Sequence, residues 1–160
     1  MSGGNPACVI PLDSWLEDDL MLSISKINSV AETAFFILKD DTILLRWFTP
    51  EIEMDLCGHA TLATAHCLNS ILNHPNKSIR FETKSGEITV DFKDDKYHMD
   101  FPTRIPLKSD LPKLISKSLN LKPLEVYKSR DYLLIYDSEE DIKKIKINTR
   151  YFNKINLDPG

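Results

Sequence analysis

Apolar residues in the first fifty positions recur at helical spacing in one segment and at strand spacing on either side of it. Between residues 14 and 28 they return every three or four positions, which predicts a helix. Ser14 with Glu17 three residues later is typical of an N-terminal capping box, so we expect the helix to begin there. Apolar and branched runs predict strands over residues 7–10, 32–38 and 43–48, and Asp40-Asp41 predicts a turn between the last two.

The segment from Gly58 to Leu72 also has helical spacing, but its composition is unusual. No formal charge occurs between Asp55 and Lys77. A helix without a charged face is typically surrounded by protein. We therefore expect a buried helix whose small residues let strands approach closely. The small residues are Ala60, Thr61, Ala63, Thr64 and Ala65.

Three segments with alternating apolar residues follow, near residues 79–83, 88–92 and 97–101. Ser85-Gly86 and Asp94-Asp95 separate them as turn residues, which predicts antiparallel hairpins. Farther along, the pattern predicts a helix over residues 109–119, a strand over 132–136 and a helix from Ser138 with Asp141 as capping partner, whereas residues 145–160 show no clear period. Together these elements predict an α+β fold of strands and antiparallel hairpins around a buried helix.

Composition narrows the class of protein. The 160 residues suffice for one globular domain, or one domain and part of another. A net charge of −4 without clustered Lys and Arg argues against nucleic-acid binding. No apolar run approaches the ~18 residues that span a bilayer, and no signal peptide is visible. Three cysteines, Cys8, Cys57 and Cys67, cannot all pair, so we expect reduced thiols and a cytoplasmic location.

The start of the buried helix, Cys57-Gly58-His59, is the first candidate for chemistry. The first amides of a helix lack intrahelical acceptors, and a substrate carboxylate could bind them where Gly58 leaves the end open. His59 could donate a hydrogen bond or transfer a proton. The alternative is that Gly58 only shapes a tight turn and that His59 only caps it. Cys57 is either a thiol activated by the helix N-terminus or a small buried hydrophobic residue.

Glu32 is the second candidate, because it directly precedes the apolar run 34–38. A carboxylate at the edge of a core loses hydration and becomes useful as a general acid or base. The alternative is an exposed glutamate at a strand start. Glu51, Glu53 and Asp55 lie in a connecting segment and are expected to be solvated. No metal site is expected, since Cys57, His59, His66 and Cys67 fit no usual zinc spacing and one helix cannot turn all four inward.

Several motifs, taken in order, resemble those of phenazine-biosynthesis-like (PhzF-type) isomerases. They are Gly4-Asn5-Pro6-Ala7, Glu32-Thr33-Ala34-Phe35, Leu45-Arg46-Trp47-Phe48-Thr49-Pro50 and Asp55-Leu56-Cys57-Gly58-His59-Ala60-Thr61, followed by Ser85-Gly86 and Arg130-Asp131-Tyr132. The resemblance implies a fold similar to diaminopimelate epimerase, in which each of two lobes is a curved antiparallel sheet wrapped around a central helix. It also implies a cofactor-independent isomerase that acts on a small carboxylated metabolite.

The resemblance assigns roles to single residues. Glu32 matches the glutamate that moves a proton between carbon atoms, and Gly58 and His59 match positions that line the substrate site. Cys57 matches a common cysteine of the family to which no catalytic role is assigned. Asp55, in the same motif, is a further candidate for the site. Where the family usually has Ser before the glutamate, this chain has Ala31.

The resemblance also predicts a domain organisation. The first strand of the family and its second lobe are not found in these residues, so we interpret 1–122 as the first lobe and 123–160 as the start of a crossover. Apolar surface that normally faces a second lobe would favour self-association, for example a homodimer. Two rival hypotheses remain: a catalytically inactive lobe that acts as a protein-interaction module, and a thiol-dependent racemase that uses Cys57.

Overall fold

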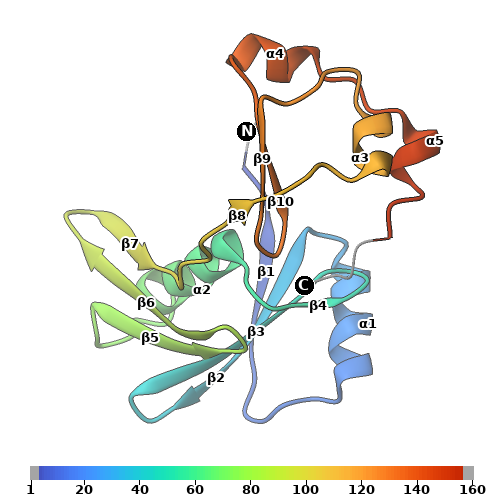
Figure 1. The fold of residues 1–160 in the computed structure, drawn as a ribbon. Coiled ribbons are helices and arrows are strands. Elements are labelled where there is room, and N and C mark those ends of the chain that lie inside the picture. The colour runs from blue at the N-terminus through green and yellow to red at the C-terminus, as the bar shows by residue number, and fades with distance from the viewer. Residues whose placement is uncertain (1–3, 157–160) are drawn as a thin grey trace. The chain divides into compact units, whose positions relative to one another are not determined.

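The computed structural model describes residues 4–156, which divide into two compact units over residues 4–102 and 103–156 (Figure 1). The boundary between units follows Pro102, whereas the division into a lobe and a crossover at residue 122 stays a prediction. No helix among the described residues is long and apolar enough to cross a membrane.

The described part of the first unit is a sheet with two helices. Its strands are β1 (Ala7–Pro11), β2 (Glu32–Lys39), β3 (Thr42–Phe48), β4 (Glu53–Met54), β5 (Ser78–Thr83), β6 (Gly86–Lys93) and β7 (Lys96–Asp100), and its helices are α1 (Asp18–Asn28) and α2 (Gly58–Ser70). The strand order is β1-β2-β3-β5-β6-β7, with the short β4 paired to β3. The predicted α+β class is confirmed.

The sheet is mixed, so the prediction of a purely antiparallel sheet is wrong. β1 pairs with β2 in parallel and β3 pairs with β5 in parallel, while the other pairs are antiparallel. Parallel neighbours need a crossover, and α1 and α2 supply the two crossovers. The sequence pattern identified the strands but could not show which of them become neighbours.

The predicted hairpin turns are confirmed. Asp40 between β2 and β3, and Asp94 and Asp95 between β6 and β7, have positive φ, a conformation that Asp tolerates better than most residues. Gly86, which opens β6, has φ +100°, where a residue with a Cβ atom would be strained.

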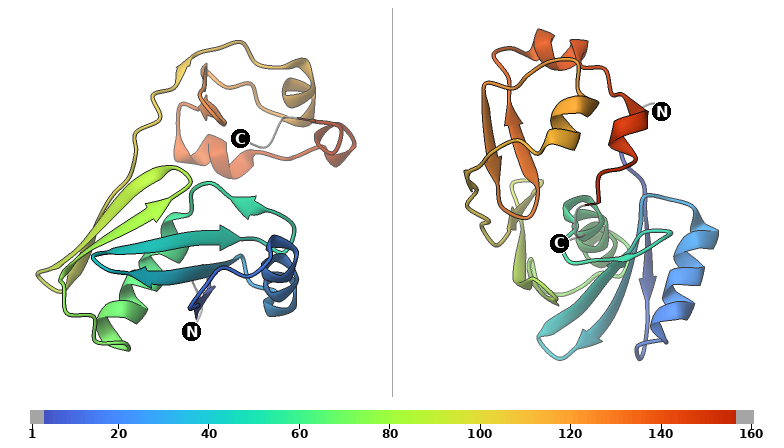
Figure 2. Two further views of the ribbon diagram at one scale, coloured as in Figure 1. Left: turned by 90° about the horizontal axis from the view of Figure 1, so that it is seen from below. Right: turned by 45° about the vertical axis from the view of Figure 1, so that its right-hand side comes forward.

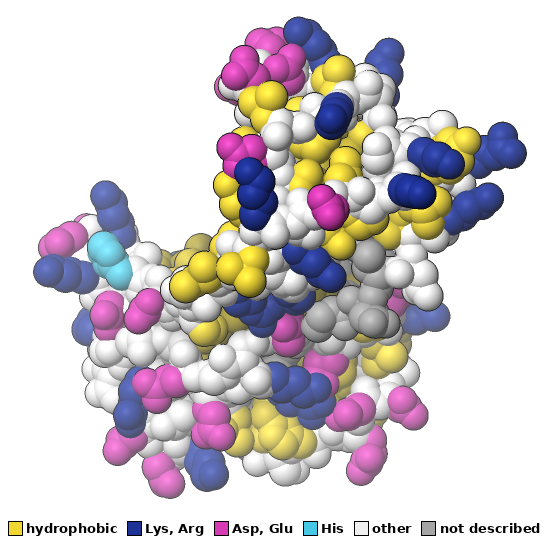
Figure 3. All heavy atoms as spheres, in the orientation of Figure 1, with side chains coloured by type: hydrophobic (Ala, Val, Ile, Leu, Met, Phe, Trp, Pro, Cys, Tyr) yellow, Lys and Arg dark blue, Asp and Glu magenta, His cyan; other side chains and the backbone are white. Residues whose placement is uncertain are grey.

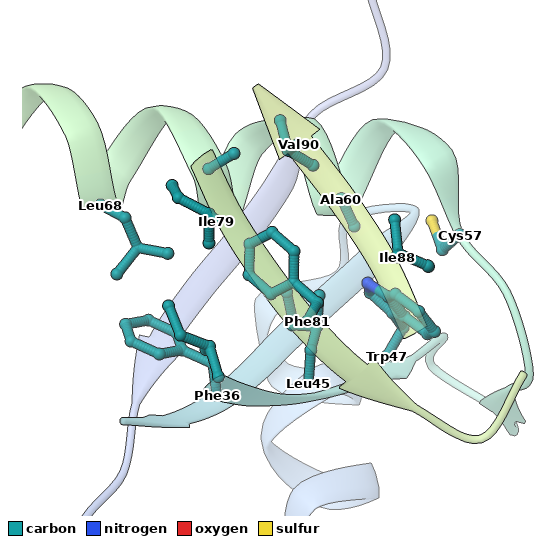
Figure 4. Close-up of a cluster of buried hydrophobic side chains, with 13 residues drawn as sticks. Phe36, Leu45, Trp47, Cys57, Ala60, Leu68, Ile79, Phe81, Ile88 and Val90 are labelled. Atoms are coloured by element: carbon teal, nitrogen blue, oxygen red, sulfur yellow. The ribbon is translucent and has the colours of Figure 1, made fainter. Parts of the chain in front are cut away.

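Helix α2 lies in the hollow of the curled sheet (Figure 2). Ala60, Ala65 and Leu68 of α2 are fully buried against aromatic and branched residues of the strands. Cys57 lies at one end of this cluster and Leu68 near the other (Figure 4). The strand residues are Ala34, Phe36, Ile43, Leu45, Trp47, Ile79, Phe81, Ile88 and Val90.

The helix is not enclosed on all sides, which corrects the expectation drawn from its lack of charge. Leu62, His66 and Ser70, spaced one helical turn apart, are exposed within the described residues. Thr61 and Thr64 are buried, and their hydroxyls donate to the carbonyls of Cys57 and Ala60 one turn earlier. Polar but uncharged residues therefore fill the helix without leaving buried hydroxyls unsatisfied.

The opposite face of the sheet carries α1. Met21 of α1 packs on Phe35 and Phe48 in a second apolar cluster. The helix begins at Asp18, not at Ser14, and Glu17 is its N-cap residue without a side-chain cap. The reason is that Trp15 and Leu16 pack against the second cluster before the helix begins.

The described part of the second unit contains a small antiparallel sheet and short helices. The strands are β8 (Leu107–Lys108), β9 (Glu125–Lys128) and β10 (Tyr132–Ile135), in the order β10-β9-β8, and the helices are α3 (Lys113–Ser118), α4 (Glu139–Lys144) and α5 (Thr149–Phe152). α3 is shorter than the predicted helix 109–119 because Pro112 takes the N-cap position. The short α5 lies where no period was visible, while residues 157–160 of that segment lie outside the described residues.

Helix α4 confirms the predicted cap. The Ser138 side chain accepts a hydrogen bond from the Asp141 amide. Lys143 makes ion pairs with Glu139 and Glu140, and acidic and basic side chains stand side by side there (Figure 3). Lys143 therefore lies on an exposed helix face with acidic partners of its own.

Candidate active site

Glu32 is the first residue of β2 and lies on the face of the sheet that carries α2. Side chains two apart on a strand share a face, and Ala34 and Phe36 on the same strand belong to the core beneath α2. Only 16% of the Glu32 side chain is exposed. The alternative of an exposed glutamate at a strand start is therefore wrong.

Cys57, Gly58 and His59 form the start of α2. Cys57 is the N-cap residue in an extended conformation, and the first hydrogen bond of the helix runs from the Thr61 amide to the Cys57 carbonyl at 3.2 Å. The amides of Gly58, His59 and Ala60 precede that bond and have no acceptor within the helix. The helix dipole makes this end positive, which favours an anion next to it.

The structure brings Glu32 and His59 together. Glu32 Oε2 lies 2.9 Å from His59 Nε2, close enough for an ion pair when the imidazole is protonated. Both atoms are buried, yet the two are not aligned as a hydrogen bond, and neither has another hydrogen-bond partner among the described residues. Buried polar atoms are rarely left in this state, so the pair is a candidate for contact with a ligand.

Cys57 completes the cluster. Its sulfur lies 3.5 Å from His59 Nδ1, and one donor atom from each of Glu32, Cys57 and His59 lies within 4.8 Å of the other two. Burial, together with a smaller contribution from the nearby Glu32 charge, raises the pKa of the Cys57 thiol to about 11. The amides of Ala60 and His59 favour the thiolate but only partly offset these effects. Cys57 is therefore a protonated thiol at neutral pH and not an activated nucleophile.

Gly58 has an ordinary helical backbone, without a positive φ. A Cβ atom built at this position would lie 3.8 Å from Phe101 Cζ, an ordinary van der Waals distance. Neither backbone conformation nor packing in this chain therefore requires glycine here. The interpretation that Gly58 only shapes a tight turn therefore loses its basis in backbone conformation, while a role at an open helix end stays a prediction.

Asp55 does not join the cluster of Glu32, Cys57 and His59. Its carbonyl accepts a hydrogen bond from Ser85 Oγ at 2.8 Å, which ties the segment before α2 to the turn between β5 and β6. That contact makes the Ser85-Gly86 motif part of the scaffold for the helix start.

The expectation that Glu53 is solvated is wrong, because only 12% of its side chain is exposed. It accepts two hydrogen bonds from Arg46, at 2.6 Å from Nε and 2.8 Å from Nη2, and another from Lys84. Arg46 also contacts Asp18 at 2.9 Å. This network of Arg46, Glu53, Lys84 and Asp18 fixes β4, which leads into Cys57.

Fold and site together define a curved α+β unit with a carboxylate and an imidazole at the start of its helix. Residues 1–155 match the PhzC-PhzF family, described as phenazine biosynthesis-like protein. The chain is also 45% identical over 139 residues to a Pseudomonas aeruginosa protein named uncharacterized isomerase PA2770, which covers 87% of this chain and 54% of that protein. The chain therefore belongs to the phenazine biosynthesis-like family.

Solved structures agree with this assignment. A PhzF-family protein of Enterococcus faecalis matches with a TM-score of 0.81 and 36% identity, covering 96% of this chain and 59% of that one. A predicted epimerase of Pseudomonas aeruginosa, PA4716, matches with a TM-score of 0.67 at 16% identity, covering 98% of this chain and 62% of that one, and shows likeness of fold alone. The chain spans about half the length of the curated relatives it matches.

Proposed function

We propose that this chain takes part in a cofactor-independent isomerisation in which Glu32 moves a proton between carbon atoms of a small carboxylated substrate. The observation that carries the proposal is the buried Glu32–His59 pair, 2.9 Å apart at the start of α2 and without a hydrogen bond. Relatives named isomerases support the reaction class. The three free cysteines are in keeping with a cytoplasmic, reducing location.

The geometry suggests a role for each residue. The substrate carboxylate would bind at the start of α2 beside the Gly58 amide, where the helix dipole favours an anion. Glu32 as carboxylate would take a proton from the adjacent C–H bond, and the electron pair would delocalise toward the bound carboxylate. Glu32 would then deliver a proton to another carbon after exchange with solvent, so that no net proton, electron or cofactor is consumed. His59, within contact of Glu32, would orient the carboxylate.

The rival racemase that uses Cys57 is less well supported. Such an enzyme needs a thiolate, and the pKa of Cys57 is raised to about 11 because the thiol is buried. The other rival, an interaction module without catalysis, does not account for the buried Glu32–His59 contact.

We further propose that the chain self-associates. Several apolar side chains of the first unit are more than half exposed, among them Ile27, Leu38 and Ile71. Apolar surface of this kind favours association. Light scattering on the purified protein should give a mass above 18.3 kDa, whereas a monomeric mass at all concentrations would contradict this part of the proposal.

Solvent hydrogen exchange tests the reaction class without knowledge of the natural substrate. The chain is incubated in D2O with a panel of unsaturated and α-substituted carboxylic acids, and deuterium at carbon is followed by NMR. Glu32→Gln should lower the exchange rate by about 100-fold or more, in the range that general acid–base groups supply. The matched control is Glu51→Gln, an exposed glutamate of the same unit, which should leave the rate unchanged.

A wild-type chain that exchanges no member of the panel would contradict the proposal. Exchange that survives Glu32→Gln and is lost in Cys57→Ser would favour the thiol-dependent rival instead.

A further inference from the structure

Cys57, His59 and Glu32 form a chain of polar side chains that runs through the His59 ring. Cys57 Sγ lies 3.5 Å from Nδ1 of the ring, and Glu32 Oε2 lies 2.9 Å from Nε2. The two neighbours therefore contact opposite nitrogens of one imidazole. In a neutral imidazole one nitrogen carries the proton and the other accepts, so the partner of one nitrogen decides what the other presents.

The hydrogen bonds of the Cys57 sulfur show which partner donates at Nδ1. The backbone amides of His59 and Ala60 donate to the sulfur, which uses its capacity as an acceptor. The thiol keeps its own proton at neutral pH, because burial raises its pKa to about 11. The side-chain acceptor that lies beside this proton is Nδ1. The Cys57 S–H group is therefore the donor in this contact, and Nδ1 is the acceptor.

The proton of the neutral ring then belongs on Nε2, where it faces Glu32. The opposite form of the ring would place a nitrogen lone pair against the carboxylate at 2.9 Å and deprive the thiol of its acceptor. Nε2 and Oε2 are both buried, so solvent does not relieve that repulsion. The pair is not aligned as a hydrogen bond, but the terminal torsions of His and Glu are broad, and a small rotation aligns the N–H group with Oε2.

We propose that Cys57 is a positioning residue, whose thiol donates a hydrogen bond to His59 Nδ1 and thereby holds the ring in the Nε2–H form that orients the Glu32 carboxylate. The effect on proton transfer rests on the proposed function, whereas the form of the ring does not. Cys57 then contributes to the site without acting as a nucleophile or a base. A hydroxyl group can replace the thiol in this role, and a methyl group cannot.

Nitrogen NMR tests the form of the ring without a substrate. The full chain is labelled with ¹⁵N-histidine, and two-bond ¹H–¹⁵N correlations are recorded at a pH above the titration of the ring, where they distinguish a protonated nitrogen from an acceptor. The chain has four histidines, so the His59 signals are assigned by their loss in His59→Gln. We expect Nε2 to carry the proton and Nδ1 to show the shift of a hydrogen-bonded acceptor.

Two substitutions of Cys57 separate its hydrogen bond from its bulk. Cys57→Ser keeps a donor, so His59 should retain the wild-type nitrogen signals. Cys57→Ala removes the donor, so the Nδ1 signal should move toward the shift of a free acceptor. The matched control is Cys67→Ala, which removes a free thiol of the same helix outside the cluster and should leave the His59 signals unchanged.

Deuterium exchange measures the consequence for proton transfer. Cys57→Ala should lower kcat for exchange about tenfold, the effect of one hydrogen bond, and leave KM unchanged because the substrate carboxylate would bind beside Gly58. Cys57→Ser should stay within about threefold of wild type, and Cys67→Ala should match wild type. Rescue by serine is a result that a packing role would not give, since alanine fills an apolar position at lower cost than a hydroxyl.

The proposal is overturned by a wild-type ring with its proton on Nδ1, by unchanged His59 signals in a folded Cys57→Ala chain, or by exchange at the wild-type rate in that variant. Complete loss of exchange in both Cys57 variants would overturn it as well, because the thiol itself would then be the base. A wild-type chain with the expected form of the ring that exchanges no acid of the panel would support the role of Cys57 at the ring and contradict the proposed function alone.

Discussion

Glu53 and Glu32 are two glutamates of the same sheet with similar burial, 12% and 16% exposed, but with different surroundings. Glu53 accepts hydrogen bonds from Arg46 and Lys84, and Arg46 stacks on Trp15 and Phe48 at 5.3 and 5.1 Å. Glu32 faces His59 without a hydrogen bond. Burial alone therefore does not distinguish the two carboxylates.

The difference in hydrogen bonding separates a structural charge from a candidate functional one. Burial by itself raises the pKa of Glu53, but the hydrogen bonds from Arg46 and Lys84 outweigh it and lower the pKa below its usual value. Glu53 therefore remains charged and fixed. Glu32 keeps acceptor capacity that a substrate can use, because the fold does not saturate it.

The largest effect on stability is expected from Arg46→Met. The substitution leaves Glu53 buried with Lys84 as its remaining partner, so we expect a loss of about 3 kcal/mol in the free energy of unfolding. Urea denaturation measures it. The matched control is Arg80→Met, at an exposed position of β5, which should change the free energy of unfolding by no more than about 0.5 kcal/mol. Equal losses in both variants would show that the Arg46 network is not structural.

The second largest effect is expected from acid, which should weaken the ion pair between Glu53 and Arg46. Because the folded pKa of Glu53 is lowered from its usual 4.5, its contribution is complete above that value and is lost as the pH falls through the folded pKa. Glu53→Gln should cost about 2 kcal/mol near pH 6. The variant should also lose less stability than wild type between about pH 6 and pH 3. Identical acid dependence in both proteins, measured by urea denaturation, would contradict this assignment.

Cys57→Ser should cost less stability and leave proton transfer intact. A buried hydroxyl in place of a thiol is expected to destabilise by about 1 kcal/mol, because a polar atom is desolvated at a 7% exposed position. Deuterium exchange per folded molecule should stay within about threefold of wild type, since the neutral thiol takes no proton. A much larger loss of exchange would transfer the catalytic role from Glu32 to Cys57.

Gly58→Ala should have the smallest effect on stability. Alanine favours helix and meets only Phe101 at an ordinary distance, so we expect a change within about 0.5 kcal/mol. Exchange should nevertheless fall, because the methyl group would crowd the start of α2, where the substrate carboxylate would bind. Gly86→Ala is the contrasting control, since its φ of +100° makes alanine cost about 1 kcal/mol or more without affecting exchange. Unchanged exchange in Gly58→Ala would argue against substrate binding at the helix start.

Much of the fold could be predicted because it is encoded locally. Alternating residues gave the strands of the first unit, and Asp40, Asp94 and Asp95 marked turns through their tolerance of positive φ. Strand neighbours could not be predicted, since the parallel pairing of β1 with β2 is a tertiary choice. The two-residue strands β4 and β8 are too short to show a period.

The candidate site could likewise be predicted only in part. The motifs identified Glu32, Gly58 and His59, but their pattern could not show that Glu32 and His59 are in contact. The pKa of Cys57 depends on two opposing effects, burial and the helix amides, and only the structure shows that burial dominates. The burial of Glu53 could not be predicted, because a connecting segment looks solvated until Arg46 is placed beside it.

One paired measurement tests the central claim most directly: unfolding free energy and deuterium exchange, determined on the same preparations of Glu32→Gln and Glu53→Gln. We predict that Glu32→Gln changes stability by about 1 kcal/mol or less and lowers exchange by about 100-fold or more. Glu53→Gln should lose about 2 kcal/mol and keep exchange per folded molecule. If Glu32→Gln retains exchange, or if both variants lose stability alike, the division into a structural and a functional carboxylate is wrong.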